Sequence, residues 1–204
     1  MPVSFGNWVA ALVVIAVAYV IGSIPFGVIV GTMRGVDLTR VGSGNIGATN
    51  AYRGLGAGWG FLVFFLDFVK GLVPVLVAKD WFSGQSVTIC LIATALIVGH
   101  VWSCFLGFRG GKGIATGGAA VLAVSPLAGI LTIAVWIIVL VLYRYVSVAS
   151  LAATVSVGFW LGMQPDYGGF YVVWAFFLVL LTLYTHRDNL ARLTTRTEPK
   201  IGRP

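Results

Sequence analysis

Charged side chains are scarce in this chain of 204 residues, where Asp, Glu, Lys and Arg together make up 9% of the sequence. A water-soluble domain has roughly a quarter of its residues charged. Hydrophobic residues make up 59% of the chain, so too little polar surface is left to cover a soluble globule. The composition therefore excludes a soluble protein and predicts an integral membrane protein.

Acidic residues and cysteines are also few. Six Asp and Glu residues stand against 13 Lys and Arg residues, which gives a net charge of +7. The two cysteines, Cys90 and Cys104, lie in one apolar segment. On a helix their spacing corresponds to about 21 Å of rise, which is too far for a disulfide. The sequence predicts neither a metal cluster nor a nucleotide cofactor.

Long hydrophobic runs fill most of the chain. A helix needs about 20 apolar residues to cross a bilayer core of about 30 Å. We expect an all-α, polytopic membrane helix bundle with seven transmembrane segments, forming a single domain over residues 1–204. The first run begins near Trp8 without a basic region or cleavage site before it, so we expect it to be retained. The expected spans are residues 8–31, 60–78, 86–106, 114–125, 127–143, 148–163 and 170–185.

Positive charge is distributed unevenly between the loops. One set of loops offers only Lys79, beside Asp80, and a lone Asp166. The positive-inside rule therefore predicts a cytoplasmic C-terminus and an N-terminus outside. A single crossing over residues 114–143 would move the basic tail outside and is disfavoured, whereas a re-entrant hairpin there keeps the same sidedness and remains open. The cations assigned to the cytoplasmic side are Arg34, Arg40, Arg53, Arg109, Lys112, Arg144, Arg187, Arg192, Arg196, Lys200 and Arg203.

A basic, glycine-rich loop lies between two apolar segments at residues 107–117. Its glycines let backbone N–H groups converge on an anion, and Arg109 and Lys112 add positive charge. The spacing misses a Walker A motif, because three residues separate Gly107 from Gly111 and because Gly113 follows Lys112. The loop therefore predicts a phosphate head group held at the bilayer edge. A loop whose charge only fixes the topology is the alternative.

A second glycine-rich loop follows the first span at residues 42–50, Gly-Ser-Gly-Asn-Ile-Gly-Ala-Thr-Asn. With Asp67 it imitates a dinucleotide fingerprint, but membrane segments flank it instead of the strand and βαβ unit that such a site needs. Ser43, Asn45 and Arg53 supply hydroxyl, amide and guanidinium groups, and the arginine fork can bind two phosphate oxygens. These groups favour substrate binding over glycines that merely turn the chain.

Further polar groups lie inside or beside the spans. Asp67 and Lys70 are three residues apart in the second span, where each charge costs about 2.5–3.5 kcal/mol. They can pair with each other, and Lys70 can also support the anion site. His186 and Asn189 would share a helix face after the last span, where the histidine is either an ordinary hydrogen-bonding residue or a catalyst. Ser150, at a predicted cytoplasmic junction, either caps a helix or contacts substrate.

Three motifs resemble the bacterial acyl-phosphate-dependent glycerol-3-phosphate acyltransferase family and follow the same order along the chain: the loop at residues 42–50, the loop at residues 107–117 and the stretch that begins at His186. The resemblance runs nearly end to end, with two departures: Arg196 stands where the family usually has glycine, and Trp102-Ser103-Cys104 replaces a Phe-Pro-containing stretch. The motifs are residues 42–50 with Arg53, Gly99-His100 leading to residues 105–116, and His186-Arg187-x-Asn189 with Arg192-Leu193 and residues 198–202. Flanking matches are Gly22-Ser23-Ile24-Pro25 and Leu66-Asp67-x-x-Lys70-Gly71.

The resemblance implies transfer of a fatty acyl group from acyl phosphate to the 1-hydroxyl of sn-glycerol 3-phosphate, giving lysophosphatidic acid and phosphate in phospholipid biosynthesis. It implies a multi-pass protein of the bacterial inner membrane whose active site faces the cytoplasm. The implied partners are the two substrates, membrane lipid and a soluble enzyme that produces acyl phosphate. We expect a monomer, with no cofactor, no metal and no nucleic-acid partner.

The resemblance also assigns residues to the site. The predicted catalytic residues are Ser43, Lys112, His186 and Asn189. The predicted substrate-binding residues are Gly42, Gly44, Asn45, Gly47, Arg53, Lys70, Gly110, Gly111, Gly113 and Ser150. Acyl phosphate is already activated, so no covalent nucleophile is needed. Either His186 or a substrate phosphate oxygen accepts the proton of the attacking hydroxyl, and we favour the phosphate.

Three other functions are weaker. Acyl-CoA-dependent acyltransferases carry His-x-x-x-x-Asp, whereas Phe105 and Ala191 stand five residues after the two histidines, His100 and His186. A transporter would bring polar groups to the midplane, often in repeated halves, and no repeat is visible here. A purely structural membrane subunit would tolerate loss of Lys112 or Arg53.

Overall fold

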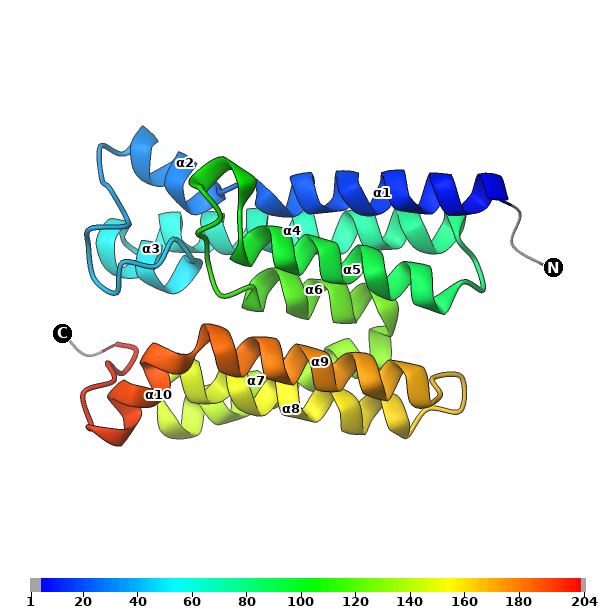
Figure 1. The fold of residues 1–204 in the computed structure, drawn as a ribbon. Helices are drawn as coiled ribbons and strands as arrows, with labels where there is room; N and C mark the ends of the chain where they lie inside the picture. The colour runs from blue at the N-terminus through cyan, green and yellow to red at the C-terminus, as the bar shows by residue number, and fades with distance from the viewer. Residues whose placement is uncertain (1–4, 203–204) are drawn as a thin grey trace. The chain divides into compact units, whose positions relative to one another are not determined.

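The computed structural model describes residues 5–202. Within that range the regular structure is helical and contains no strand, only an isolated bridge between Ser103 and Arg109. Arg203, the last cation of the predicted basic tail, lies outside the described residues. The chain divides into two compact units, Met1–Val124 and Ser125–Pro204, called unit 1 and unit 2 below (Figure 1). The expected all-α class is confirmed.

The helices of the two units follow one another along the chain. Unit 1 contains α1 (Phe5–Ser23), α2 (Phe26–Met33), α3 (Ala48–Leu55), α4 (Ala57–Trp81), α5 (Ser86–Val101), the 3-10 helix η1 (Cys104–Leu106) and α6 (Ile114–Val124). Unit 2 contains α7 (Pro126–Tyr143), α8 (Val146–Gly162), α9 (Gly169–Thr185) and α10 (Arg187–Thr194).

Three stretches of the described residues are long and apolar enough to cross a membrane. They are Trp8–Met33, which joins α1 and α2, then α4 and α7. The pair α9 and α10, bent by 61°, makes a fourth if it is taken as one span. The apolar helices α5, α6 and α8 are shorter than a full crossing requires. Seven crossings and the sides of the two termini therefore stay predictions.

In unit 1 the helices pack closely because glycines remove side chains from their contacts. α1 lies alongside α5, and α4 lies against both α5 and α6 (Figure 1). A Cβ added at Gly22 would collide with the backbone of Leu96, and one at Gly71 with the carbonyl of Thr116. Lys79 secures the far end of α6 by donating to the carbonyls of Ala123 and Val124 at 2.8 and 3.0 Å.

The first expected span, residues 8–31, is interrupted between α1 and α2 at Ile24 and Pro25. Proline has no N–H and disfavours helix in the residue before it, so carbonyls near the break need other donors. The Ser103 hydroxyl donates to the Ser23 carbonyl at 2.6 Å, and the Lys70 ammonium donates to the Ile24 carbonyl at 2.8 Å. The break is therefore held by groups that are distant in sequence.

One expected boundary differs from the structure, and the expected division of residues 114–143 at Pro126 is present. The third expected span, residues 86–106, ends as an α-helix at Val101, and η1 follows as a separate turn capped by Ser103. The stretch 114–143 is not one continuous helix, since Ser125 caps α7 by accepting from the Ala128 N–H at 3.3 Å and Pro126 occupies its first turn.

In unit 2, α8 packs against both α7 and α9 (Figure 1). α7 ends at Arg144, which adopts the left-handed conformation with φ of 64°. The residues after α10 return to this turn: the Ile201 N–H donates to the Arg144 carbonyl, and the Arg144 guanidinium donates to the Ile201 carbonyl, both at 2.9 Å. The tail and the α7–α8 turn thus share one end of unit 2.

Candidate active site

The loop at residues 42–50 is organised by the buried side chain of Asn50, which is 1% exposed. Its amide nitrogen donates to the carbonyls of Leu38 and Val41 at 2.9 and 3.0 Å. Its oxygen accepts from the N–H of Ser43 at 2.9 Å and from the Ser43 hydroxyl at 3.3 Å. The hydrogen-bonded amide of Asn50 therefore joins the two sides of the loop and holds Ser43 at the surface of the loop.

The glycines of this loop are required by backbone conformation and by close approach. Gly42 and Gly44 have φ of 56° and 68°, in the left-handed region that favours glycine. A Cβ at Gly42 would also collide with Oδ1 of Asn50. The Asn45 side chain accepts from the Gly47 N–H at 2.9 Å, which turns the chain into α3. The exposed Arg53 follows in the last turn of α3.

The second loop, between α5 and α6, folds back onto the end of α5. The Phe108 N–H donates to the Ser103 carbonyl at 2.9 Å, and the Gly111 N–H donates to the His100 carbonyl at 3.0 Å. Gly107, Phe108 and Gly113 adopt positive φ angles. Arg109 is exposed and Lys112 half-buried.

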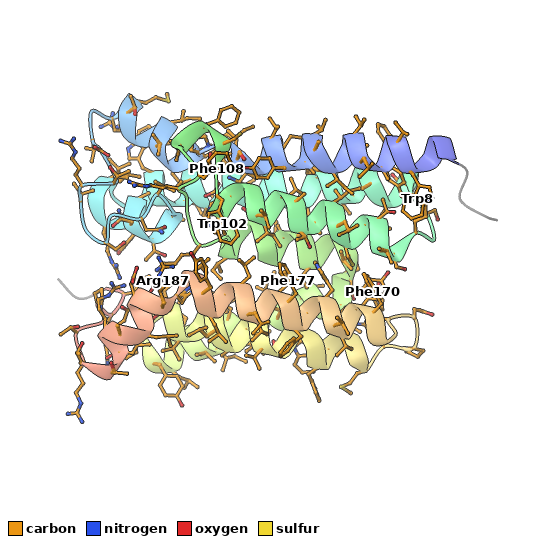
Figure 2. All side chains as sticks on the ribbon, viewed as in Figure 1. Trp8, Trp102, Phe108, Phe170, Phe177 and Arg187 are labelled. Atoms are coloured by element: carbon orange, nitrogen blue, oxygen red, sulfur yellow. The ribbon has the colours of Figure 1, made fainter. Side chains whose placement is uncertain are left out.

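Both loops lie at the same end of unit 1. A Cβ at Gly27 of α2 would collide with the carbonyl of Ile46 in the first loop, while Ser103 of the second loop bonds to the end of α1. Figure 2 shows Phe108 on the second loop, beside α2. The structure therefore brings Ser43, Arg53 and Lys112 to one end of one compact unit, as the sequence predicted.

In unit 2 the tail is held by the carboxylate of Glu198. It accepts from the Ser147 hydroxyl at 2.7 Å, from the Asn189 amide at 2.6 Å and from Arg192 Nε at 2.8 Å. Burial alone would raise the pKa of Glu198, but these three hydrogen bonds outweigh it and hold the pKa below its ordinary value of 4.5. Asn189 is thus positioned by a residue that the sequence did not assign to the site.

His186 is buried in the junction between α9 and α10, beside Arg187 (Figure 2). Its Nδ1 lies 2.9 Å from the carbonyl of Thr182. A carbonyl can only accept, so this contact places a proton on Nδ1 and makes Nε2 the acceptor nitrogen of the neutral ring. His186 stands at the N-cap of α10 and Asn189 in its first turn, so the two residues lie three apart just after α9 ends at Thr185, and their shared face stays a prediction.

Ser150 and Lys70 are both buried. The Ser150 hydroxyl donates to the Val146 carbonyl at 2.8 Å and accepts from the indole N–H of Trp136 at 3.2 Å. The Lys70 ammonium pairs with Asp67 at 2.7 Å, which is the pairing that their spacing predicted. Contacts of either residue with substrate stay a prediction.

Sequence reasoning missed the residues that hold the site residues in place. Asn50, Ser147 and Glu198 make buried hydrogen bonds to or around predicted site residues. Glu198 had a visible signal, since it is an isolated acid in an otherwise basic stretch after Asp188. Asn50 had only its place at the end of a polar loop.

The family model for glycerol-3-phosphate acyltransferase matches residues 12–196. This chain belongs to the glycerol-3-phosphate acyltransferase family. A glycerol-3-phosphate acyltransferase of Aquifex aeolicus is 43% identical over 191 residues, covering 94% of this chain and 99% of the relative. One from a strain of Thermus thermophilus is 41% identical over 198 residues, covering 95% of this chain and 96% of the relative.

Solved structures of a glycerol-3-phosphate acyltransferase share the fold. The glycerol 3-phosphate form of the integral membrane enzyme PlsY superposes with a TM-score of 0.91 at 42% identity, covering 95% of this chain and 96% of that one. Its lysophosphatidic acid form gives 0.88 at 41% identity with the same coverage. The resemblance read from the three motifs is confirmed, and so is the integral membrane class.

Proposed function

We propose that this chain transfers a fatty acyl group from acyl phosphate to the 1-hydroxyl of sn-glycerol 3-phosphate, giving lysophosphatidic acid and inorganic phosphate. The observation that supports this most directly is the position of the two glycine-rich loops, with Ser43, Arg53 and Lys112, at the same end of unit 1. Both substrates carry a phosphate and one carries a long tail. Cationic loops at the edge of an apolar bundle suit such a pair.

In this proposal each of the two loops binds one of the two substrates. Ser43 and the backbone N–H groups of residues 42–47 hold the acyl phosphate and polarise its carbonyl. Arg53 and Lys112 bind the phosphate of glycerol 3-phosphate, with the backbone of Gly110, Gly111 and Gly113 around it. An oxyanion donor contributes about 3–4 kcal/mol, and fixed geometry about 7–11 kcal/mol, to lowering the barrier.

The family resemblance also assigns substrate contacts to Ser150 and Asn189, and the 1-hydroxyl of glycerol 3-phosphate is the nucleophile. The hydroxyl oxygen attacks the acyl carbon, the bond between that carbon and the anhydride oxygen breaks, and phosphate leaves with the electron pair. A substrate phosphate oxygen takes the proton of the attacking hydroxyl. His186 is the other candidate base, since a neutral ring that donates from Nδ1 to the Thr182 carbonyl would present an unprotonated Nε2.

The proposal includes the cellular setting. The reaction takes place on the cytoplasmic side of the bacterial inner membrane, because the positive-inside rule assigns the basic loops to that side. The protein acts as a monomer, and a soluble enzyme supplies acyl phosphate. Lys70, predicted from the sequence to support the anion site, is buried and paired with Asp67, so we propose that it supports the site without contacting substrate.

The test is to incubate detergent-purified protein with palmitoyl phosphate and labelled glycerol 3-phosphate. We expect labelled lysophosphatidic acid from the wild type. Lys112→Ala and Arg53→Ala should each lower kcat/KM for glycerol 3-phosphate by about a hundredfold, since each removes a charged hydrogen-bonding group. Arg40→Ala is the matched control, because Arg40 is an exposed cation paired with Asp37 in the same region.

Two further arms separate the alternatives. Acyl-CoA should not replace palmitoyl phosphate, and measurable transfer from it would point to the other acyltransferase class. Proteoliposomes that accumulate unmodified glycerol 3-phosphate would instead indicate a transporter. If Lys112→Ala and Arg53→Ala both matched Arg40→Ala in activity, the assigned phosphate site would be wrong.

A further inference from the structure

A chain of buried polar groups runs beneath the second loop in unit 1. Asp67, Lys70 and His100 are 3%, 5% and 5% exposed. Lys70 Nζ lies 2.7 Å from Asp67 Oδ1, and His100 Nδ1 lies 3.5 Å from the same oxygen. The second separation is longer than a good hydrogen bond, so that contact is mainly electrostatic.

The two ends of this row of buried polar groups reach the backbone that shapes the site. At one end the Lys70 ammonium donates to the Ile24 carbonyl at the break between α1 and α2. At the other end the His100 ring lies directly against Gly111, where an added Cβ would collide with Nε2. The His100 carbonyl accepts from the Gly111 N–H, and a Cβ at Gly110 would collide with that carbonyl.

Fold stability alone explains this arrangement poorly. Taking two charges out of water is costly, and apolar side chains of similar volume often replace a buried ion pair with no loss of stability. The aspartate also holds α6, because the Thr116 hydroxyl donates to the Asp67 carbonyl at 3.0 Å, but any residue would supply that carbonyl. The burial of the Asp67 and Lys70 side chains therefore indicates a role beyond packing.

We propose that Asp67, Lys70 and His100 are positioning residues that set the backbone of Gly110 and Gly111 and thereby hold Lys112 in register for a phosphate. This role rests on the proposed function of the second loop. Lys70 anchors the carboxylate to the helix break, the carboxylate orients the imidazole, and the imidazole supports the glycine pair. None of the three touches substrate.

The first test replaces the imidazole by an apolar side chain of similar size. His100→Leu should raise the KM for glycerol 3-phosphate about tenfold or more, because a loop displaced by a fraction of an ångström grips the phosphate less well. The KM for palmitoyl phosphate should stay within about twofold of wild type. Thr88→Val is the matched control, since Thr88 is equally buried on the same helix and distant from the loop in sequence.

The second test separates positioning from stability. Asp67→Leu and Lys70→Met each leave one buried charge without its counterion, so each should lower the midpoint of thermal unfolding. The double variant Asp67→Leu/Lys70→Met removes both charges and should recover most of the lost midpoint, the remainder reflecting the Ile24 carbonyl that Lys70 no longer meets. Its KM for glycerol 3-phosphate should nevertheless stay raised about tenfold.

The outcomes distinguish this inference from the proposed function. Wild-type protein that forms no lysophosphatidic acid contradicts the function itself. An active wild type with an unchanged KM in His100→Leu contradicts the positioning role alone. A double variant that regains both the unfolding midpoint and the KM shows that the pair serves only the fold, and this too overturns the inference.

Discussion

One residue, Asn50, shapes the first loop. Its buried amide donates to the carbonyls of Leu38 and Val41 and accepts from the backbone N–H of Ser43. An aspartate of the same shape could accept from Ser43 but could not donate to Leu38 or Val41. The loop therefore depends on the amide group itself. Ser43, the exposed residue to which we assign a chemical role, is held by a neighbour that never needs to meet substrate.

Gly42→Ala should damage this loop more than an ordinary surface substitution. A left-handed backbone costs a residue with a Cβ about 1–2 kcal/mol, and the new methyl group would displace the Asn50 side chain. We expect a large loss of kcat/KM with palmitoyl phosphate. Gly35→Ala is the control, since Gly35 has a similar φ of 69° but open space around its Cβ position. Equal activity of the two variants would contradict the role of the Asn50 contact.

Arg196→Gly should stabilise the protein. Arg196 stands where the family usually has glycine, and its φ of 58° is the conformation that glycine adopts without strain. Relief of about 1–2 kcal/mol is partly offset by the greater freedom of glycine in the unfolded chain, so the net gain should be up to about 1 kcal/mol. Thermal unfolding of Arg196→Gly beside Arg196→Ala measures it, and equal midpoints would show that the strain is absent.

At the scale of elements, hydrogen bonds fasten the tail after α10 to the α7–α8 turn, and we call this set of bonds the clip. Glu198 joins Ser147, at the start of α8, to Asn189 and Arg192 of α10. Two backbone-directed bonds between Arg144 and Ile201 add a second point of closure. The position of Asn189 therefore depends on the ionised state of one carboxylate.

This clip should make stability depend on pH. The folded pKa of Glu198 lies below its ordinary value of 4.5, so its contribution is complete above about that pH and is lost as pH falls through the folded value. Wild-type protein should therefore unfold at a lower temperature at pH 3.5 than at pH 7. Glu198→Gln should show a smaller difference, leaving the share of other carboxylates such as Asp37, whose hydrogen bond from Thr39 also lowers its pKa. An undiminished difference in Glu198→Gln would exclude the clip as its source.

At the scale of the whole molecule, sidedness in the membrane follows from charge. We expect single cysteines placed at Ser43, Arg109 and Arg187, in a background without Cys90 and Cys104, to react with an impermeant maleimide from the cytoplasmic side. Cysteines at Ser83 and Asp166 should react from the opposite side. All five positions are exposed. Labelling of Ser43→Cys and Arg187→Cys from opposite faces would contradict the predicted topology.

The expected helical class was confirmed where a short stretch of sequence suffices. The apolar runs became helices, and the start of α7 at Ser125 and Pro126 follows from local chemistry, whereas the break at Ile24 and Pro25 was not predicted. The end of α5 at Val101 was harder to predict, since the chain there stays apolar while Ser103 bonds to α1. The sequence did not predict the bend between α9 and α10 after Thr185.

Composition and local motifs determined by themselves that this protein is helical, lies in a membrane and carries two glycine-rich loops, because those properties depend on neighbouring residues. Only the tertiary structure decided which groups satisfy the buried polar atoms. Lys70 meets the Ile24 carbonyl across 46 residues, and Ser147 meets Glu198 across 51. Buried polar groups must find partners, but helix packing selects those partners, and no spacing along the chain specifies it.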